Sequence, residues 1–201
     1  MGNENADSLS DTGAAFLRSG LEEHMDVFRR LPPLAPVIEQ AGALIAATLS
    51  QGGKLLLCGN GGSASDSQHI AAELTGRFLN DRRPLAAVAL TTDTSALTSI
   101  ANDYTFDEVF SRQVMGLGSK GDCLLAISTS GNSRNVLRAA EVARAAGIRV
   151  IGLLGRDGGS LRALCDVAIV VPSATTARIQ EAHIFIGHTL CAMVEEALGV
   201  N

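Results

Sequence analysis

Short apolar runs that alternate with helical segments occupy the chain after residue 54. Each run is rich in Leu, Val, Ile and Ala and is too short for a helix; they lie at 54–58, 85–90, 123–128, 150–154 and 167–171. Such alternation produces a mostly parallel sheet covered by helices on both faces, and right-handed crossovers then limit its topology. We therefore predict an α/β fold, a three-layer αβα sandwich around a mostly parallel five-stranded sheet.

Two helices are expected before the first strand. The first runs from residue 8 to the proline pair at 32–33, and its apolar positions recur at intervals of three and four: Leu17, Leu21, Met25 and Phe28. The second spans about 36–50. Because a sheet of this size needs less cover, we expect the first helix to pack against a partner subunit. Residues 1–8 are expected to be a disordered lead-in, and residues 9–201 a single domain.

Composition argues against several classes of partner. The formal net charge of −5 disfavours nucleic acid and anionic membrane surfaces as partners. No apolar run reaches the roughly 18 residues that a membrane helix needs, and no charged region followed by an apolar core opens the chain, so we expect a cytoplasmic protein. The four cysteines form no Cys-x-x-Cys pair, which favours free, buried thiols in a reducing compartment.

The junction at 59–73 has the densest set of reactive side chains. Its loop, Gly-Asn-Gly-Gly at 59–62, opens a helix, and the free N–H groups and dipole of a helix start favour an anion. His69 and Glu73 are four residues apart and share a helix face, with Asp66 nearby. We expect this helix to be largely buried, so that the polar pair needs a functional reason. The alternative is a plain turn and an ordinary helix pair, because the loop matches no nucleotide-binding fingerprint.

A second loop of similar character follows the third apolar run. Residues 127–133 read Ile-Ser-Thr-Ser-Gly-Asn-Ser and open a helix at 133–146. Hydroxyls, a glycine and a helix N-terminus together can hold a phosphate without a cation. The alternative is a hydroxyl-rich turn in which Ser133 caps the helix. We favour phosphate, because both loops follow strands of a parallel sheet and ligands bind at that edge. Two such loops side by side predict that the protein binds a phosphorylated polyol.

The last predicted helix, at 176–198, supplies further polar side chains. Gln180 and His188 are eight residues apart, roughly 80° around the helix, so both can reach one site. His183 is about 140° from His188 around the helix. We interpret it as a histidine whose ring is hydrogen-bonded within the protein or lies at an interface. His188 lies among apolar residues, so a core position is its alternative.

Several motifs, in this order, resemble the phosphoheptose isomerase family, whose members have a sugar isomerase (SIS) domain. They are Cys-Gly-Asn-Gly-Gly-Ser at 58–63, Asp-Ser-Gln-His at 66–69, Glu-Leu-Thr-Gly-Arg-Phe at 73–78, Asn-Asp at 102–103, Ile-Ser-Thr-Ser-Gly-Asn-Ser at 127–133 and Arg-Ile-Gln-Glu-Ala-His at 178–183. The resemblance extends from the first helix to Leu198. It implies a homotetramer that isomerises sedoheptulose 7-phosphate, a seven-carbon sugar, to D-glycero-D-manno-heptose 7-phosphate in the biosynthesis of nucleotide-activated heptose.

The resemblance also implies roles for individual residues. One Zn²⁺ per subunit is expected, with the ligands His69, Glu73, Gln180 and His188. We predict that Glu73 is the catalytic base and that His188 moves the proton; Asp66 is the second candidate base, in case Glu73 is a firm zinc ligand. The expected substrate-binding residues are Asn60, Gly61, Gly62, Glu73, Asn102, Asp103, Ser128, Thr129, Ser130, Ser133 and Gln180.

Two other functions compete with this prediction. A non-catalytic SIS protein that binds the replication initiator DnaA shares the fold. It lacks the carboxylate and the histidine that this chain has at Glu73 and His188, which favours the enzyme. An isomerase or a sensor of another sugar phosphate would have the same phosphate loops, and the sequence does not measure the length of the sugar.

Overall fold

The computed structural model describes the backbone of residues 4–199 and the side chains of residues 12–199. Within this part of the chain, five strands form one sheet in the order β2-β1-β3-β4-β5, and all its pairings are parallel. The strands are β1 (Leu55–Cys58), β2 (Ala87–Ala89), β3 (Cys123–Ser128), β4 (Arg149–Gly155) and β5 (Val167–Val171). The predicted parallel α/β sheet is confirmed, although the strand expected at 85–90 has only three residues.

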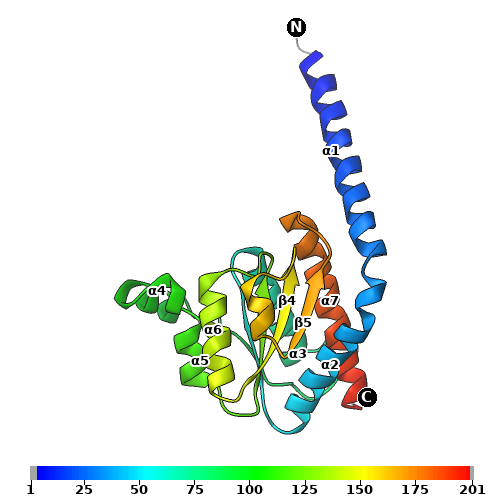
Figure 1. Ribbon diagram of the computed structural model, residues 1–201. Coiled ribbons are helices and arrows are strands. Elements are labelled where there is room, and N and C mark those ends of the chain that lie inside the picture. The colour runs from blue at the N-terminus through cyan, green and yellow to red at the C-terminus, as the bar shows by residue number, and fades with distance from the viewer. Residues whose placement is uncertain (1–3, 200–201) are drawn as a thin grey trace.

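Helices cover both faces of this sheet (Figure 1). They are α1 (Glu4–Arg29), α2 (Ala35–Ser50), α3 (Gly62–Thr75), α4 (Thr94–Asp103), α5 (Ser111–Leu117), α6 (Arg134–Ala145) and α7 (Thr176–Ala197), with short 3-10 helices at Pro32–Leu34, Phe106–Glu108 and Ser160–Leu164. Helices α2, α3 and α7 pack on one face, and α5 and α6 pack on the other. The predicted three-layer sandwich is therefore confirmed.

The two sides of the sheet bury two separate cores. Leu55 and Leu57 of β1 belong to the core under α2, α3 and α7, whereas Leu56 belongs to the core under α5 and α6. Successive side chains of a strand point to opposite faces, so a strand covered on both sides must be apolar at every position. This explains why the strands appear in the sequence as continuous apolar runs.

Helix α1 extends well beyond the body of the molecule (Figure 1). It begins at Glu4, earlier than the predicted start at residue 8, and residues 1–3 lie outside the described part of the chain. The outer part of the predicted apolar face is open, because Leu17 is 72% exposed, Leu21 53% and Met25 38%, whereas Phe28 packs against the core. Nearer the body, His24 Nδ1 lies 2.8 Å from Glu181 Oε2 of α7 and ties the base of α1 to the domain.

Helices α4 and α5 were not predicted. None of the residues of α4 is fully buried, so its sequence lacks the strong apolar stripe that identifies a helix. The local signal was a cap, because Asp93 Oδ1 accepts a 2.9 Å hydrogen bond from the main-chain N–H of Ala96. Tertiary contacts with the core under α5 and α6 then hold α4 through Leu97 and Ile100.

The four cysteines are free, as predicted. Cys58, Cys123 and Cys191 are buried, and Cys165 is half-buried. Burial raises the pKa of the Cys58 thiol to about 12, so this group stays protonated and unreactive at neutral pH. In the described chain, no helix combines the length and the apolar character needed to span a membrane.

Candidate active site

Two histidines and a glutamate meet between α3 and α7. His69 Nε2 lies 3.1 Å from Glu73 Oε1 on the next turn of α3 and 3.1 Å from His188 Nε2 on α7. One donor atom from each of these three residues lies within 4.8 Å of the others. The structure thus brings together three of the four predicted metal ligands, two of which were separated by 119 residues.

The predicted burial is wrong for His69, whereas Glu73 and His188 are partly buried. The His69 side chain is 48% exposed and the Glu73 side chain 24%. The buried side of α3 consists of Ser63, Ser67, Ile70, Ala71 and Leu74, and the reactive pair does not belong to it. The group is therefore accessible to a ligand from solvent. Its functional interpretation rests on the approach of His188, not on burial.

The two predicted anion loops lie side by side at the carboxyl edge of the sheet. Cys58 at the end of β1 is in register with Ala126 of β3, so the loops that follow both strands are neighbours. Asn60 in the first loop exchanges two hydrogen bonds, of 2.8 and 2.9 Å, with Asn135 in the first turn of α6. Sequence analysis missed Asn135. Its only signal was an amide near the start of the helix that opens at the second loop.

The second loop turns its hydroxyl groups toward each other. Ser128 Oγ and Ser133 Oγ are 3.1 Å apart, and Ser128 Oγ also accepts a 3.1 Å hydrogen bond from the N–H of Gly131. Ser133 stands at the N-cap position of α6, but its side chain makes no capping hydrogen bond, so the capping role weighed for it is wrong. The first N–H groups of α6 have no partner within the helix, which suits an anion.

A glycine is needed at position 131 of this loop. Gly131 has a φ of +64°, and a Cβ on it would overlap the main-chain oxygen of Gly158. Only glycine adopts this conformation without strain and permits that contact. The loop is therefore shaped by close packing against the segment after β4.

Gln180, the fourth predicted ligand, lies beside Gly62 of the first anion loop. Its amide packs against Gly62 in the first turn of α3, where a side chain larger than hydrogen would collide with it. Eight residues separate Gln180 from His188, about 12 Å along α7. None of the contacts found among the described residues joins Gln180 to the two histidines.

Asp66 lies one turn before His69 and Ile70 on α3 and has an unusual environment. Its Oδ2 is buried and has no hydrogen-bond partner among the described residues. Burial raises the pKa of Asp66 to about 6, against a smaller lowering by the nearby His69. A carboxylate with such a pKa is suited to general-base chemistry near neutral pH.

His183 is a core histidine and not an interface residue. It is fully buried, and its Nε2 lies 3.0 Å from the main-chain oxygen of Leu154 in β4. Burial lowers its pKa to about 4, so the ring is neutral at physiological pH. It links α7 to the sheet.

Asn102 and Asp103 lie at the carboxyl end of α4. The Asn102 amide donates a 2.8 Å hydrogen bond to Asp103 Oδ1. In the described residues, no contact joins either side chain to the cluster or to the two loops. Their predicted role in the site stays a prediction.

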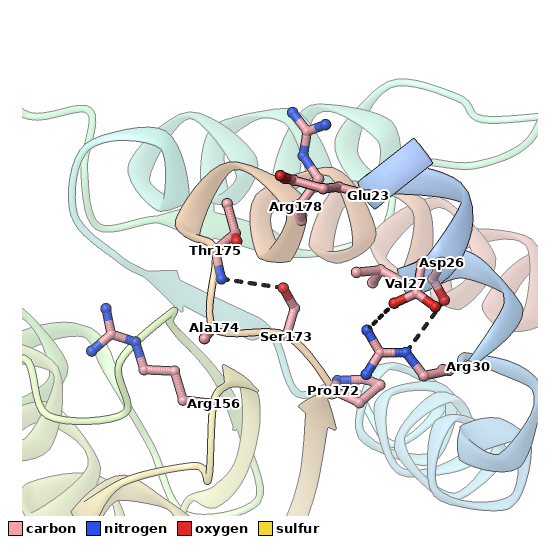
Figure 2. A pocket seen from close by; sticks show the side chains of 10 residues that line it. All are labelled: Glu23, Asp26, Val27, Arg30, Arg156, Pro172, Ser173, Ala174, Thr175 and Arg178. Atoms are coloured by element: carbon pink, nitrogen blue, oxygen red, sulfur yellow. Dashed lines mark hydrogen bonds and ion pairs between the residues drawn. The ribbon is translucent and has the colours of Figure 1, made fainter. Parts of the chain in front are cut away.

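A separate cavity of about 600 Å³ opens at the carboxyl ends of β4 and β5 (Figure 2). Three arginines line it, Arg30, Arg156 and Arg178, together with hydroxyls of the segment that leads into α7. Two of these cations already have carboxylate partners, Asp26 for Arg30 and Glu181 for Arg178. The cavity contains none of the predicted site residues, and we do not assign the chemistry to it.

The cluster passes a simple test as a metal site. Imidazole nitrogens and carboxylate oxygens are usual ligands of Zn²⁺, and bonds of about 2.0–2.1 Å place neighbouring ligand atoms of a tetrahedral ion roughly 3.3 Å apart. His69 Nε2 lies 3.1 Å from both of its neighbours, close to that spacing. Three protein ligands with a free position are typical of catalytic zinc, whereas structural sites have four.

The fold and these two loops define the class of the protein. A doubly wound parallel sheet with hydroxyl- and glycine-rich loops at its carboxyl edge is the architecture of a SIS domain, and the SIS domain family matches residues 21–155. The chain belongs to this family.

Similar proteins identify the group within the SIS domain family to which the chain belongs. The phosphoheptose isomerase of Rhodospirillum rubrum is 53% identical over 182 residues, which cover 90% of this chain and 97% of the relative. The structure of phosphoheptose isomerase GmhA from Neisseria gonorrhoeae is 47% identical with a TM-score of 0.83, covering 94% of this chain and 99% of the other. A phosphoheptose isomerase structure from Francisella tularensis is 38% identical with a TM-score of 0.84, covering 92% and 97%. The chain belongs to the phosphoheptose isomerase family and is an isomerase.

Proposed function

We propose that this enzyme converts sedoheptulose 7-phosphate to D-glycero-D-manno-heptose 7-phosphate, the first step of nucleotide-activated heptose biosynthesis. The observation that carries the proposal is that His69 and Glu73, on the helix that begins at the first anion loop, meet His188 of α7. Seven residues separate Gly62 from His69, about 10 Å along α3. An extended sugar phosphate, with its carbonyl and phosphate at opposite ends, suits that separation.

The phosphate end of the substrate is assigned to the two loops. Ser128, Thr129, Ser130 and Ser133 belong to the loop that opens α6, and the hydroxyls of Ser128 and Ser133 are 3.1 Å apart. Asn60, Gly61 and Gly62 form the neighbouring wall, which the Asn60–Asn135 pair holds in place. Gln180 lies beside Gly62, near the phosphate end, and is proposed to bind hydroxyls of the sugar.

The reacting end is assigned to the cluster. Isomerisation needs a base that takes a proton from C1, stabilisation of the enediolate oxygen, and return of a proton at C2. Glu73 is the proposed base, and His188 transfers the proton between the two oxygens. Asp66 is the second candidate base, supported by its raised pKa of about 6.

The same three residues are proposed to hold one Zn²⁺ per subunit, which when bound polarises the substrate oxygens as a Lewis acid. His69 is then a ligand without a proton-transfer role. Glu73 is a weaker base, and His188 transfers a proton less well, when each is also a ligand, and the conflict at Glu73 gives Asp66 its importance. Gln180, at its place against Gly62, serves the substrate better than the ion.

The enzyme is proposed to act as a homotetramer in the cytoplasm. The apolar side chains of α1 are open to solvent in the single chain, and His69 is half-exposed although enediolate chemistry benefits from exclusion of water. A second copy packed against α1 covers that face. Free, buried cysteines agree with a reducing compartment.

The test is turnover of sedoheptulose 7-phosphate by the purified protein before chelation, after chelation and after Zn²⁺ is restored. We expect the activity to fall after chelation and to return when Zn²⁺ is restored. If protein confirmed to be metal-free keeps its activity, the proposed role of zinc is refuted and the proposed isomerase activity stands. The absence of turnover in every state would refute the proposed substrate, and ribose and arabinose phosphates would be assayed next.

A further inference from the structure

The segment between α3 and β2, residues 76–86, has no helix or strand but is held by a buried carboxylate. Glu195 of α7 is 1% exposed. Its oxygens accept 3.1 Å hydrogen bonds from three consecutive main-chain N–H groups, those of Phe78, Leu79 and Asn80. They also accept a 2.7 Å hydrogen bond from Arg82 Nε. Burial alone would raise the pKa of Glu195, but these donors outweigh it and lower the pKa, so the group is an anion.

The guanidinium of Arg82 completes the arrangement. Its side chain is 1% exposed, and its remaining N–H groups reach the last turn of α3. Nη2 donates a 2.7 Å hydrogen bond to the main-chain oxygen of Glu73, and Nη1 donates one of 2.8 Å to that of Leu74. The last carbonyls of a helix have no partners inside it, so Arg82 acts as a cap at the carboxyl end of α3. Both members of this buried ion pair are thus hydrogen-bonded, as burial of charge requires.

The groups that the pair holds are those that position the active site. Glu73 belongs to the cluster, and Arg82 fixes its main chain. The N–H of Phe78 is fixed by Glu195, and the Phe78 ring stacks on the His188 imidazole, with centroids 5.5 Å apart and planes 17° apart. Glu195 lies two turns after His188 and on the same side of α7. One ion pair therefore connects to both helices of the site.

We propose that Arg82 and Glu195 are positioning residues for the isomerase site, acting through the carboxyl end of α3 and through the ring of Phe78. The inference rests on the proposed function of the His69, Glu73 and His188 cluster. Groups that orient metal ligands without touching the ion change metal affinity or activity by about 10- to 100-fold when they are replaced. A purely structural pair would change only the stability of the fold.

Two variants test the proposal, each with a matched control. Arg82→Lys keeps the charge but loses the planar fork that binds Glu195 and α3 at once. Its control is Arg83→Lys at the exposed neighbouring position. Phe78→Leu keeps apolar bulk but removes the ring behind His188, and its control is Phe106→Leu, at a side chain that is 60% exposed. Circular dichroism and thermal unfolding show which variants fold.

Three measurements are made on the folded proteins. In metal-free protein with 13C-labelled histidine, the His188 ring resonance, assigned with His188→Asn, should move downfield in Arg82→Lys and Phe78→Leu as the ring current of Phe78 is lost. Zn²⁺ affinity, from competition with a chromophoric chelator, should fall about 10- to 100-fold in Arg82→Lys. Turnover should lose kcat with little change in KM, because the phosphate loops are not touched. The control variants should match the wild type.

Arg82→Lys protein that is less stable but keeps the wild-type His188 resonance, Zn²⁺ affinity and kcat would overturn the proposal and leave a structural ion pair. The failure of the proposed function has a different signature. In that case the wild type itself does not turn over the sugar phosphate, while the metal-free resonance of His188 still reports whether Arg82 and Phe78 position the ring.

Discussion

Replacement of Asp66 by Asn should make the protein more stable at neutral pH. The Asp66 carboxylate has a buried oxygen without a hydrogen-bond partner among the described residues, and burial raises its pKa from 3.8 to about 6. Ionisation of Asp66 is therefore less favourable in the folded protein than in the unfolded chain, and this difference lowers the free energy of unfolding at neutral pH. At about 1.4 kcal/mol for each pKa unit, a rise of roughly two units corresponds to about 3 kcal/mol as an upper limit.

The sign of the pH dependence follows from the raised pKa. The folded protein holds the Asp66 proton more tightly than the unfolded chain, so this contribution to stability is complete below about pH 4 and is lost as the pH rises through 6. Asn mimics the protonated acid at every pH. The difference between Asp66→Asn and wild type should be close to zero at pH 4 and should reach a plateau above pH 7.

Thermal unfolding at fixed protein concentration, with chelator present, measures this difference. For a chain of this size 1 kcal/mol corresponds to roughly 2–4 °C, so Asp66→Asn should melt several degrees higher at pH 8. Asp81→Asn, at an exposed carboxylate, serves as the control and should change Tm little at either pH. A pH-independent difference, or a lower Tm at pH 8, would refute the reasoning. Turnover should stay within about tenfold of wild type, and a loss of 100-fold or more would make Asp66 the base.

Three other changes test the site and the surface. Glu73→Gln should lower kcat by about 10²- to 10⁴-fold with an unchanged circular dichroism spectrum, and a near wild-type rate would assign the base elsewhere. Ser130→Ala with Ser133→Ala should raise KM for the sugar phosphate while kcat is largely kept, and an unchanged KM would place the phosphate outside this loop. Leu17→Glu with Leu21→Glu should reduce the oligomer mass measured by light scattering, because it puts charge on the open face of α1; an unchanged mass would exclude α1 from the interface.

Much of the candidate site was predictable because local rules place its residues. His69 and Glu73 are four apart on one helix, so they face the same side wherever that helix packs. The two loops follow β1 and β3, and the carboxyl ends of parallel strands meet at one edge of the sheet. The sequence did not reveal that the Ser133 hydroxyl faces Ser128 instead of capping α6, since both arrangements satisfy a hydroxyl.

Long-range contacts account for what was missed. Asn135 pairs with Asn60 across 75 residues, and Arg82 pairs with Glu195 across 113. In the sequence, each of these residues is an ordinary polar position on a helix or in a loop. The side of α3 that is buried was also misjudged, because the buried residues include the polar Ser63 and Ser67 and the packing of α7 decides which side is covered.

The sequence by itself determined the class of fold, because apolar runs of strand length that alternate with helices leave few arrangements that bury both faces of a sheet. It also determined that reactive side chains follow two strand ends and share one helix face. Only the tertiary structure decided that His188 meets His69, that Gln180 lies against Gly62, and that a buried ion pair supports Phe78 behind His188. The physical reason is range: periodicity and capping act within a few residues of the chain, whereas the distance between α3 and α7 depends on how these two helices pack together on one face of the sheet.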